Sequence, residues 1–103
     1  MADITVRRDD AAMRYEATVD GSLAGFAQFQ LVDDLVVFTH TEVDRAVGGQ
    51  GIGSALARFA LDDVRAQGTR RVLPACPFIK GWIRRHPEYA GIVDGTLPTT
   101  ATD

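Results

Sequence analysis

Apolar and polar residues alternate along the first half of the chain. A period of two places successive side chains on opposite faces of an extended backbone, so this pattern predicts β-strands. Four strands are expected, at residues 4–6, 13–19, 23–31 and 35–43. Turn-forming residues such as the Asp-Gly-Ser run at 20–22 separate them, which favours an antiparallel meander. The fourth strand begins with a nearly continuous run of apolar and β-branched residues, and we expect it inside the sheet.

From Ile52 onward the period changes to that of a helix. Apolar residues recur at positions 52, 55, 56, 59, 60 and 64, which share one helical face. Gly68 suits the left-handed residue that ends many helices. A short strand is expected at residues 71–75, followed by a second helix at residues 77–85 with Cys76 as its N-cap. The His-Pro pair that comes next ends this helix.

The predicted order of elements is β-β-β-β-α-β-α, which is an α+β fold. The strand–helix–strand unit in the second half should pair its two strands in parallel through a right-handed crossover. Phe59, Phe78 and Trp82 fall at helical spacing and are assigned to the core. We expect a single domain over residues 1–94 and a loose tail over residues 95–103.

Composition narrows the class of protein. The chain has 103 residues, a mass of 11.1 kDa and a formal net charge of -3. This length allows one small domain, and 46% hydrophobic residues argue against general disorder. The acidic balance argues against a nucleic-acid partner, and the lack of a long apolar run or a leader-like N-terminus argues against a membrane or exported protein. We therefore expect a cytoplasmic monomer or weak homodimer.

The cysteine and histidine content limits the possible metal and disulfide chemistry. Cys76 is the single cysteine, which excludes an internal disulfide and four-cysteine zinc sites. A free thiol fits a reducing compartment. The two histidines, His40 and His86, have no partners at metal-ligand spacing, so no metal site is expected.

Four glycines fall within residues 48–53, between a predicted strand and a predicted helix. Glycine lets the backbone approach a ligand, and the first helical turn adds unpaired N–H groups and the positive end of a dipole. This combination favours an anion site of pyrophosphate size, with a simple flexible turn as the alternative. The lysine of a P-loop is missing, and Leu56 stands where a dinucleotide fingerprint needs glycine.

Two segments carry a family resemblance: G-G-Q-G-I-G-S-A-L, which follows H-T-E-V, and P-A-C-P-F-I-K-G-W-I-R-R-H-P-E-Y. They resemble the GNAT superfamily of acetyl-CoA-dependent N-acetyltransferases, and in particular its minimal YjdJ-type branch, over about residues 40–89. The resemblance implies a three-layer α/β architecture of the GNAT kind, in which splayed central parallel strands hold the pantetheine arm near the end of the fourth strand. The residues that it assigns to acetyl-CoA binding are Val43, Gly49, Gln50, Gly51, Ile52, Gly53 and Ser54.

Two features depart from the family pattern. Gly48 stands where the family usually has Arg or Gln, which removes a side-chain contribution to phosphate binding. The chain has only a turn, near residues 20–22, where longer members of the family have two helices. The acceptor site is therefore expected to be open, or completed by a partner chain.

Acetyl transfer to an amine needs a base, a donor to the developing oxyanion and a proton for the leaving thiolate. His40 and Glu42 lie two residues apart on one strand and share a face, so both are candidates for proton transfer. The alternatives are a histidine bonded to a neighbour and a solvated carboxylate. Cys76, at a helix N-terminus, is the third candidate, as leaving-group acid or transient acyl acceptor. Its alternative is an inert buried cysteine.

The sequence thus favours an N-acetyltransferase in which a primary amine attacks acetyl-CoA directly. The amine would belong to a small molecule or to a protein. A non-catalytic module that binds CoA or acyl-CoA is the competing hypothesis, and it predicts affinity without turnover.

Overall fold

A computed structural model describes residues 3–47 and 51–94. Gly49, Gln50 and the expected tail at 95–103 lie outside the described residues. The described chain forms one five-stranded sheet in the order β1-β2-β3-β4-β5. Its strands are β1 (Ile4–Asp9), β2 (Arg14–Val19), β3 (Ser22–Val32), β4 (Leu35–Val43) and β5 (Arg71–Pro74). The first four strands are antiparallel neighbours, and β4 pairs with β5 in parallel, as the sequence predicts.

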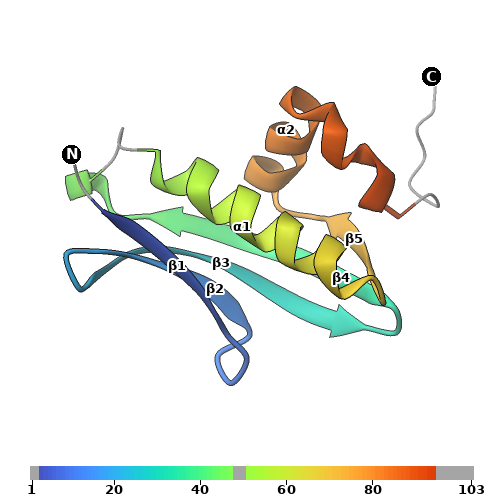
Figure 1. The fold of residues 1–103 in the computed structure, drawn as a ribbon, viewed down its shortest axis with the longest axis horizontal. Coiled ribbons are helices and arrows are strands. Elements are labelled where there is room, and N and C mark those ends of the chain that lie inside the picture. The colour runs from blue at the N-terminus through green and yellow to red at the C-terminus, as the bar shows by residue number, and fades with distance from the viewer. Residues whose placement is uncertain (1–2, 48–50, 95–103) are drawn as a thin grey trace.

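Helix α1 (Ile52–Gln67) lies across the sheet and contacts every strand, as Figure 1 shows. Helix α2 (Pro77–Arg85) follows β5 and packs against α1. Two short 3-10 helices complete the chain, η1 (Arg45–Val47) and η2 (Pro87–Ile92), and neither was predicted. The α+β class and the order of the strands and α-helices are confirmed. Among the described residues, no helix is long and apolar enough to cross a membrane.

The element boundaries follow local backbone chemistry. Asp20 and Gly21 both have positive φ, 51° and 82°, as a two-residue hairpin turn requires. Gly68 has a φ of 69° and donates its N–H to the carbonyl of Val64 at 3.2 Å, which ends α1 in the expected left-handed conformation. Cys76 is the N-cap of α2 and is followed by a proline at the first helical position. These boundaries therefore agree with the predictions from sequence.

A β-bulge in β4 changes which side chains face α1. Phe29 pairs with Phe38, but Gln28 pairs with His40, so Thr39 is an extra residue opposite β3. Before the bulge, the buried positions are 36 and 38, and after it the more buried positions are 41 and 43. The bulge thus reverses the alternation, and His40 falls on the face away from the core.

The core lies between α1 and the sheet. Its largest fully buried side chains are Trp82, Tyr15, Phe38, Ile52, Leu56, Leu61, Ile79 and Val72. The prediction that Trp82 is a core residue is confirmed. The same prediction is wrong for Phe59 and Phe78, which are 40% and 37% exposed. Helical spacing identifies the apolar face of a helix, but it does not show whether the whole width of that face is covered.

Both tyrosines are buried and donate to carboxylates on α1. The Tyr15 hydroxyl lies 2.7 Å from Asp63 Oδ2, and the Tyr89 hydroxyl lies 2.7 Å from Asp62 Oδ1. Burial is the main cause that raises the pKa of both tyrosines, and the adjacent carboxylate is the second. The rise in pKa is large for Tyr15. The neutral phenols therefore favour the folded state.

We expect the tyrosines to ionise only as the protein unfolds. Because both folded pKa values exceed the unfolded value of about 10, their contribution to stability is complete below pH 10 and is lost as the pH rises above it. Alkaline titration should show tyrosinate absorbance and loss of the circular dichroism signal together. A tyrosinate signal near pH 10 from a chain with native circular dichroism would contradict this account.

Candidate active site

The parallel pairing between β4 and β5 is short, and this opens the sheet. Leu35–Phe38 pairs with Arg71–Pro74, and no other strand pairing along this edge of β4 occurs among residues 3–47 and 51–94. Pro74 has no N–H to donate, and the Cys76 N–H makes the last contact, at 2.8 Å from the Phe38 carbonyl. The edge of β4 from Thr39 onward is therefore free of β5, as expected for splayed strands.

Cys76 and Thr41 meet where the two strands separate. The Cys76 thiol donates to Thr41 Oγ1 at 3.3 Å, and Cys76 is only 3% exposed. Cys76 also occupies the N-cap of α2, but its side chain makes no capping hydrogen bond. Its thiol proton is therefore directed toward β4 rather than toward the helix backbone.

A groove of about 510 Å³ runs between the end of β4, the start of α1 and one side of α2. Its lining residues are Val43, Asp44, Arg45, Gly51, Ile52, Gly53, Ser54, Phe78, Trp82, Arg85 and His86. Every described residue that the resemblance assigns to acetyl-CoA is in this list. The structure thus brings these five positions together, while Gly49 and Gln50 lie outside the residues that it describes.

The first N–H groups of α1 have no partner within the helix, and their residues line this groove. The first intrahelical hydrogen bond runs from the Ala55 N–H to the Gly51 carbonyl at 2.9 Å. The N–H groups of the three preceding helical residues therefore have no partner within the helix. Gly51 has a φ of 81° and no side chain that could cap them. The positive end of the helix dipole and the two arginines on the walls, Arg45 and Arg85, outweigh the one carboxylate there, Asp44, so the groove favours an anion.

Helix α2 supplies the opposite wall of the groove. Trp82 Nε1 donates to Ser54 Oγ at 2.8 Å, which joins α2 to the first turn of α1. The His86 ring stacks on Trp82 with centroids 3.8 Å apart, and its Nδ1 lies 2.8 Å from the Trp82 carbonyl. A carbonyl only accepts, so Nδ1 carries the proton. Sequence reasoning gave Trp82, His86 and Phe78 no part in this site.

Phe78 reaches its place in the groove because residue 53 is glycine. A Cβ atom on Gly53 would lie 2.8 Å from the tip of the Phe78 ring, so the ring occupies space that any other residue would take. This glycine therefore serves close packing rather than an unusual backbone conformation. The resemblance assigned Gly53 to acetyl-CoA binding, and nothing in the sequence signalled this contact.

His40 and Glu42 form a pair on the other face of β4. His40 Nε2 lies 2.9 Å from Glu42 Oε1, and the two side chains are 55% and 64% exposed. Thr41 points toward Cys76, so its two neighbours on the strand point away from it. The structure therefore brings His40 and Glu42 together, as their spacing predicts, but it does not bring either one to Cys76.

A second hollow, of about 640 Å³, adjoins the groove and shares residues 43–45 with it. Its walls include the apolar side chains of Leu23 and Phe26 and the carboxylates of Glu42 and Asp44. No group of three or more His, Cys, Asp or Glu side chains able to hold a metal occurs in the described part of the chain.

Comparison with known proteins gives a family match. Residues 14–92 match the family described as GCN5-related N-acetyl-transferase. Comparison with the curated proteins finds no significant match.

Solved structures share the fold. A GCN5-like putative N-acetyltransferase from Staphylococcus aureus aligns over 100% of both chains with a TM-score of 0.70 and 17% identity. A ribosomal-protein-alanine N-acetyltransferase from Brucella melitensis gives a TM-score of 0.59 and 22% identity over 93% of this chain and 73% of that one. The ribosomal-protein-S18-alanine N-acetyltransferase from Escherichia coli gives a TM-score of 0.57 and 25% identity over 65% of this chain. The alignment spans only 43% of the Escherichia coli enzyme.

Phe78 and Phe59 provide a matched pair for testing the groove, because both rings are more than a third exposed. Phe78→Ala removes a wall of the groove, and we expect it to weaken acetyl-CoA binding about tenfold. Phe59 packs against Tyr15 instead, so Phe59→Ala should leave that affinity unchanged. Trp82 is the only tryptophan and lines the groove, so its fluorescence reports binding. Equal losses of affinity in both variants would rule out this groove as the binding site.

Proposed function

The chain belongs to the family of GCN5-related N-acetyltransferases, and we propose that it transfers an acetyl group from acetyl-CoA to a primary amine. The observation that carries the proposal is the continuity between the groove and the opening beside β4. Thr41 and Val43 lie on the same face of that strand, so the contact of Thr41 with Cys76 adjoins the groove that Val43 lines. One extended ligand can therefore reach from the start of α1 to Cys76.

Acetyl-CoA fits this path by its chemistry. Its pyrophosphate matches the unpaired N–H groups at the start of α1 and the nearby Arg45 and Arg85. Its pantetheine arm carries amide groups, which can pair with the backbone of β4 beyond Phe38, where β5 has departed. The thioester would then lie near Cys76 and Thr41. This arrangement agrees with the resemblance found in the sequence.

The acceptor's ammonium group first releases one proton to solvent, because only the neutral amine has a free electron pair, and transfer from the neutral amine then requires two proton movements. The amine nitrogen attacks the thioester carbonyl carbon, the carbon–sulfur bond breaks, and the nitrogen loses a proton to a base. The departing CoA thiolate takes a proton, and we assign this step to the Cys76 thiol. The Cys76 thiolate then recovers a proton from solvent. His40 and Glu42 are assigned to the base side, on the face of β4 from which the amine would approach.

The acceptor would be a cationic amine of a small molecule or a protein. The hollow next to the groove carries the carboxylates of Glu42 and Asp44 together with an apolar surface, which suits an ammonium group on an aliphatic chain. The Escherichia coli and Brucella structures are named for alanine of a ribosomal protein, which is a protein amine. A cytoplasmic setting is part of the proposal, because the free thiol of Cys76 suits a reducing compartment.

Cys76→Ala tests both the role of the thiol and the competing hypothesis of a binding module. If Cys76 is the leaving-group acid, the variant should lower kcat by about 10²-fold and leave the affinity for acetyl-CoA unchanged. Glu42→Gln should also lower kcat, because it removes a candidate base, and it should leave the affinity for acetyl-CoA unchanged. Release of CoA with a panel of small amines and peptide N-termini measures both effects. Affinity without turnover for any acceptor would favour the binding module.

Intact-mass measurement distinguishes the two roles of Cys76. Direct transfer predicts no acetyl adduct when the reaction with acetyl-CoA is quenched before an amine is added. An adduct on the wild type that is absent from Cys76→Ser would instead show an acyl-cysteine intermediate.

A further inference from the structure

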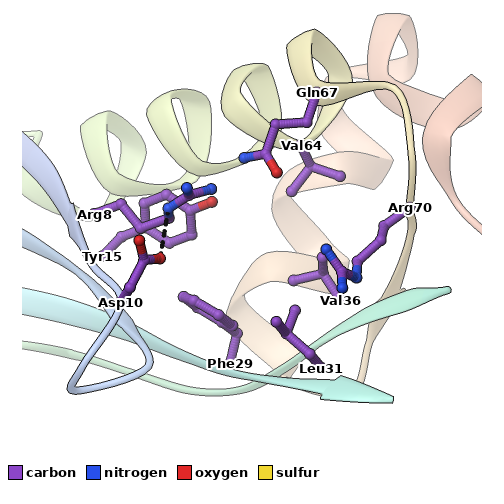
Figure 2. A pocket seen from close by; sticks show the side chains of 9 residues that line it. All are labelled: Arg8, Asp10, Tyr15, Phe29, Leu31, Val36, Val64, Gln67 and Arg70. Atoms are coloured by element: carbon purple, nitrogen blue, oxygen red, sulfur yellow. Dashed lines mark ion pairs between the residues drawn. The ribbon is translucent and has the colours of Figure 1, made fainter. Parts of the chain in front are cut away.

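A third cavity, apart from the groove and the hollow beside it, lies beneath the C-terminal end of α1, at the opposite end of that helix from the groove. Figure 2 shows it between the last turn of α1 and the sheet. It has a volume of about 90 Å³, which is about three times the volume of a water molecule in the liquid. Apolar side chains form much of its wall, namely Phe29, Leu31, Val36 and Val64. The cavity can therefore hold only a small molecule with an apolar part.

The polar groups at the β1 end of the cavity are all paired. Asp63 Oδ2 accepts from the Arg8 guanidinium at 2.8 Å, from the Tyr15 hydroxyl at 2.7 Å and from the Gln67 amide at 2.8 Å. Arg8 also pairs with Asp10 at 2.8 Å, and Figure 2 marks this contact. The charge of Arg8 is thus neutralised within the protein, and this end offers no free cation.

Arg70 forms the other end of the cavity, and its guanidinium group, unlike that of Arg8, has a donor without a partner. Its Nε atom is buried and has no hydrogen-bond partner, and it is the one buried side-chain nitrogen or oxygen in this condition among the described residues. Figure 2 shows the side chain reaching back from the loop after α1 toward Val36 and Leu31. A guanidinium N–H that is shielded from water and lacks an acceptor is costly, so this group is suited to an acceptor supplied from outside.

We propose that this cavity binds a small monocarboxylate with a short aliphatic chain, and that Arg70 holds the carboxylate. A planar carboxylate matches the fork of guanidinium donors, and the aliphatic chain would lie against Phe29, Leu31, Val36 and Val64. A dianion such as phosphate fits less well, because the remaining walls are apolar and the carboxylates of Asp10 and Asp63 lie at the other end.

This site is separate from the proposed acetyl-CoA groove. Helix α1 has 16 residues, which at 1.5 Å per residue places about 24 Å between its two ends. Of the residues that line the two cavities, none is shared. A ligand here would contact the loop that leads into β5, and its binding does not depend on acetyl transfer.

The test uses butyrate as the probe and butyramide, its uncharged counterpart of the same shape, as the control. Titration of the isotopically labelled full chain, followed by amide chemical shifts, should place the shifts around Arg70 and Val36. A ligand with so few atoms should bind with a dissociation constant on the order of 1 mM. Butyramide should bind at least about tenfold more weakly, because it lacks the charge-assisted hydrogen bonds to Arg70.

Arg70→Gln should weaken butyrate binding at least about tenfold, because it removes the guanidinium group. Arg84→Gln, which changes an exposed arginine of α2, should leave butyrate binding unchanged. Leu31→Trp, at a position 43% exposed, should fill the cavity and abolish binding with Arg70 intact. The proposal is wrong if wild type does not bind butyrate, if butyramide or phosphate binds equally well, or if Arg70→Gln has no effect. Shifts confined to the start of α1 would also overturn it.

Discussion

The early end of the pairing between β4 and β5 determines the rest of the site. A full parallel pair would satisfy the edge of β4 and leave no opening in the sheet. Here Pro74 cannot donate to the ladder, the Cys76 N–H makes the last bond to the Phe38 carbonyl, and α2 starts at once with a proline. The rest of β4 therefore has no strand paired along this edge among residues 3–47 and 51–94, and Cys76 lies where the two strands separate.

The groove depends on a second constraint, which is the contact between the two helices. The hydrogen bond from Trp82 to Ser54 joins the side of α2 to the first turn of α1, so one wall forms opposite the helix N-terminus. Gly53 lets the Phe78 ring enter between them. Two short segments brought together by packing thus form a groove with an aromatic wall opposite the N-terminus of α1.

The sequence alone predicted the elements whose ends are marked by special residues, such as Gly68 after α1 and Cys76 before α2. It could not show the bulge at Thr39, because residues 35–38 are all apolar and residues 39–42 are all polar, so no alternation marks the point where the buried face changes. That bulge separates His40 from Cys76 across β4. Nor could periodicity show that Phe78 lines a groove, since a groove wall and a core face have the same spacing.

The central claim is that the start of α1 binds the pyrophosphate of acetyl-CoA, and Gly51 tests it most directly. Asn and Asp both tolerate its left-handed conformation, so Gly51→Asn and Gly51→Asp differ mainly in charge. Acetyl-CoA at about 100 times its dissociation constant should stabilise wild type by about 2.7 kcal/mol, and each kcal/mol raises Tm by about 4–8 °C. The account predicts this shift in wild type, most of it in Gly51→Asn and none in Gly51→Asp. No shift in wild type, or equal shifts in both variants, would contradict it.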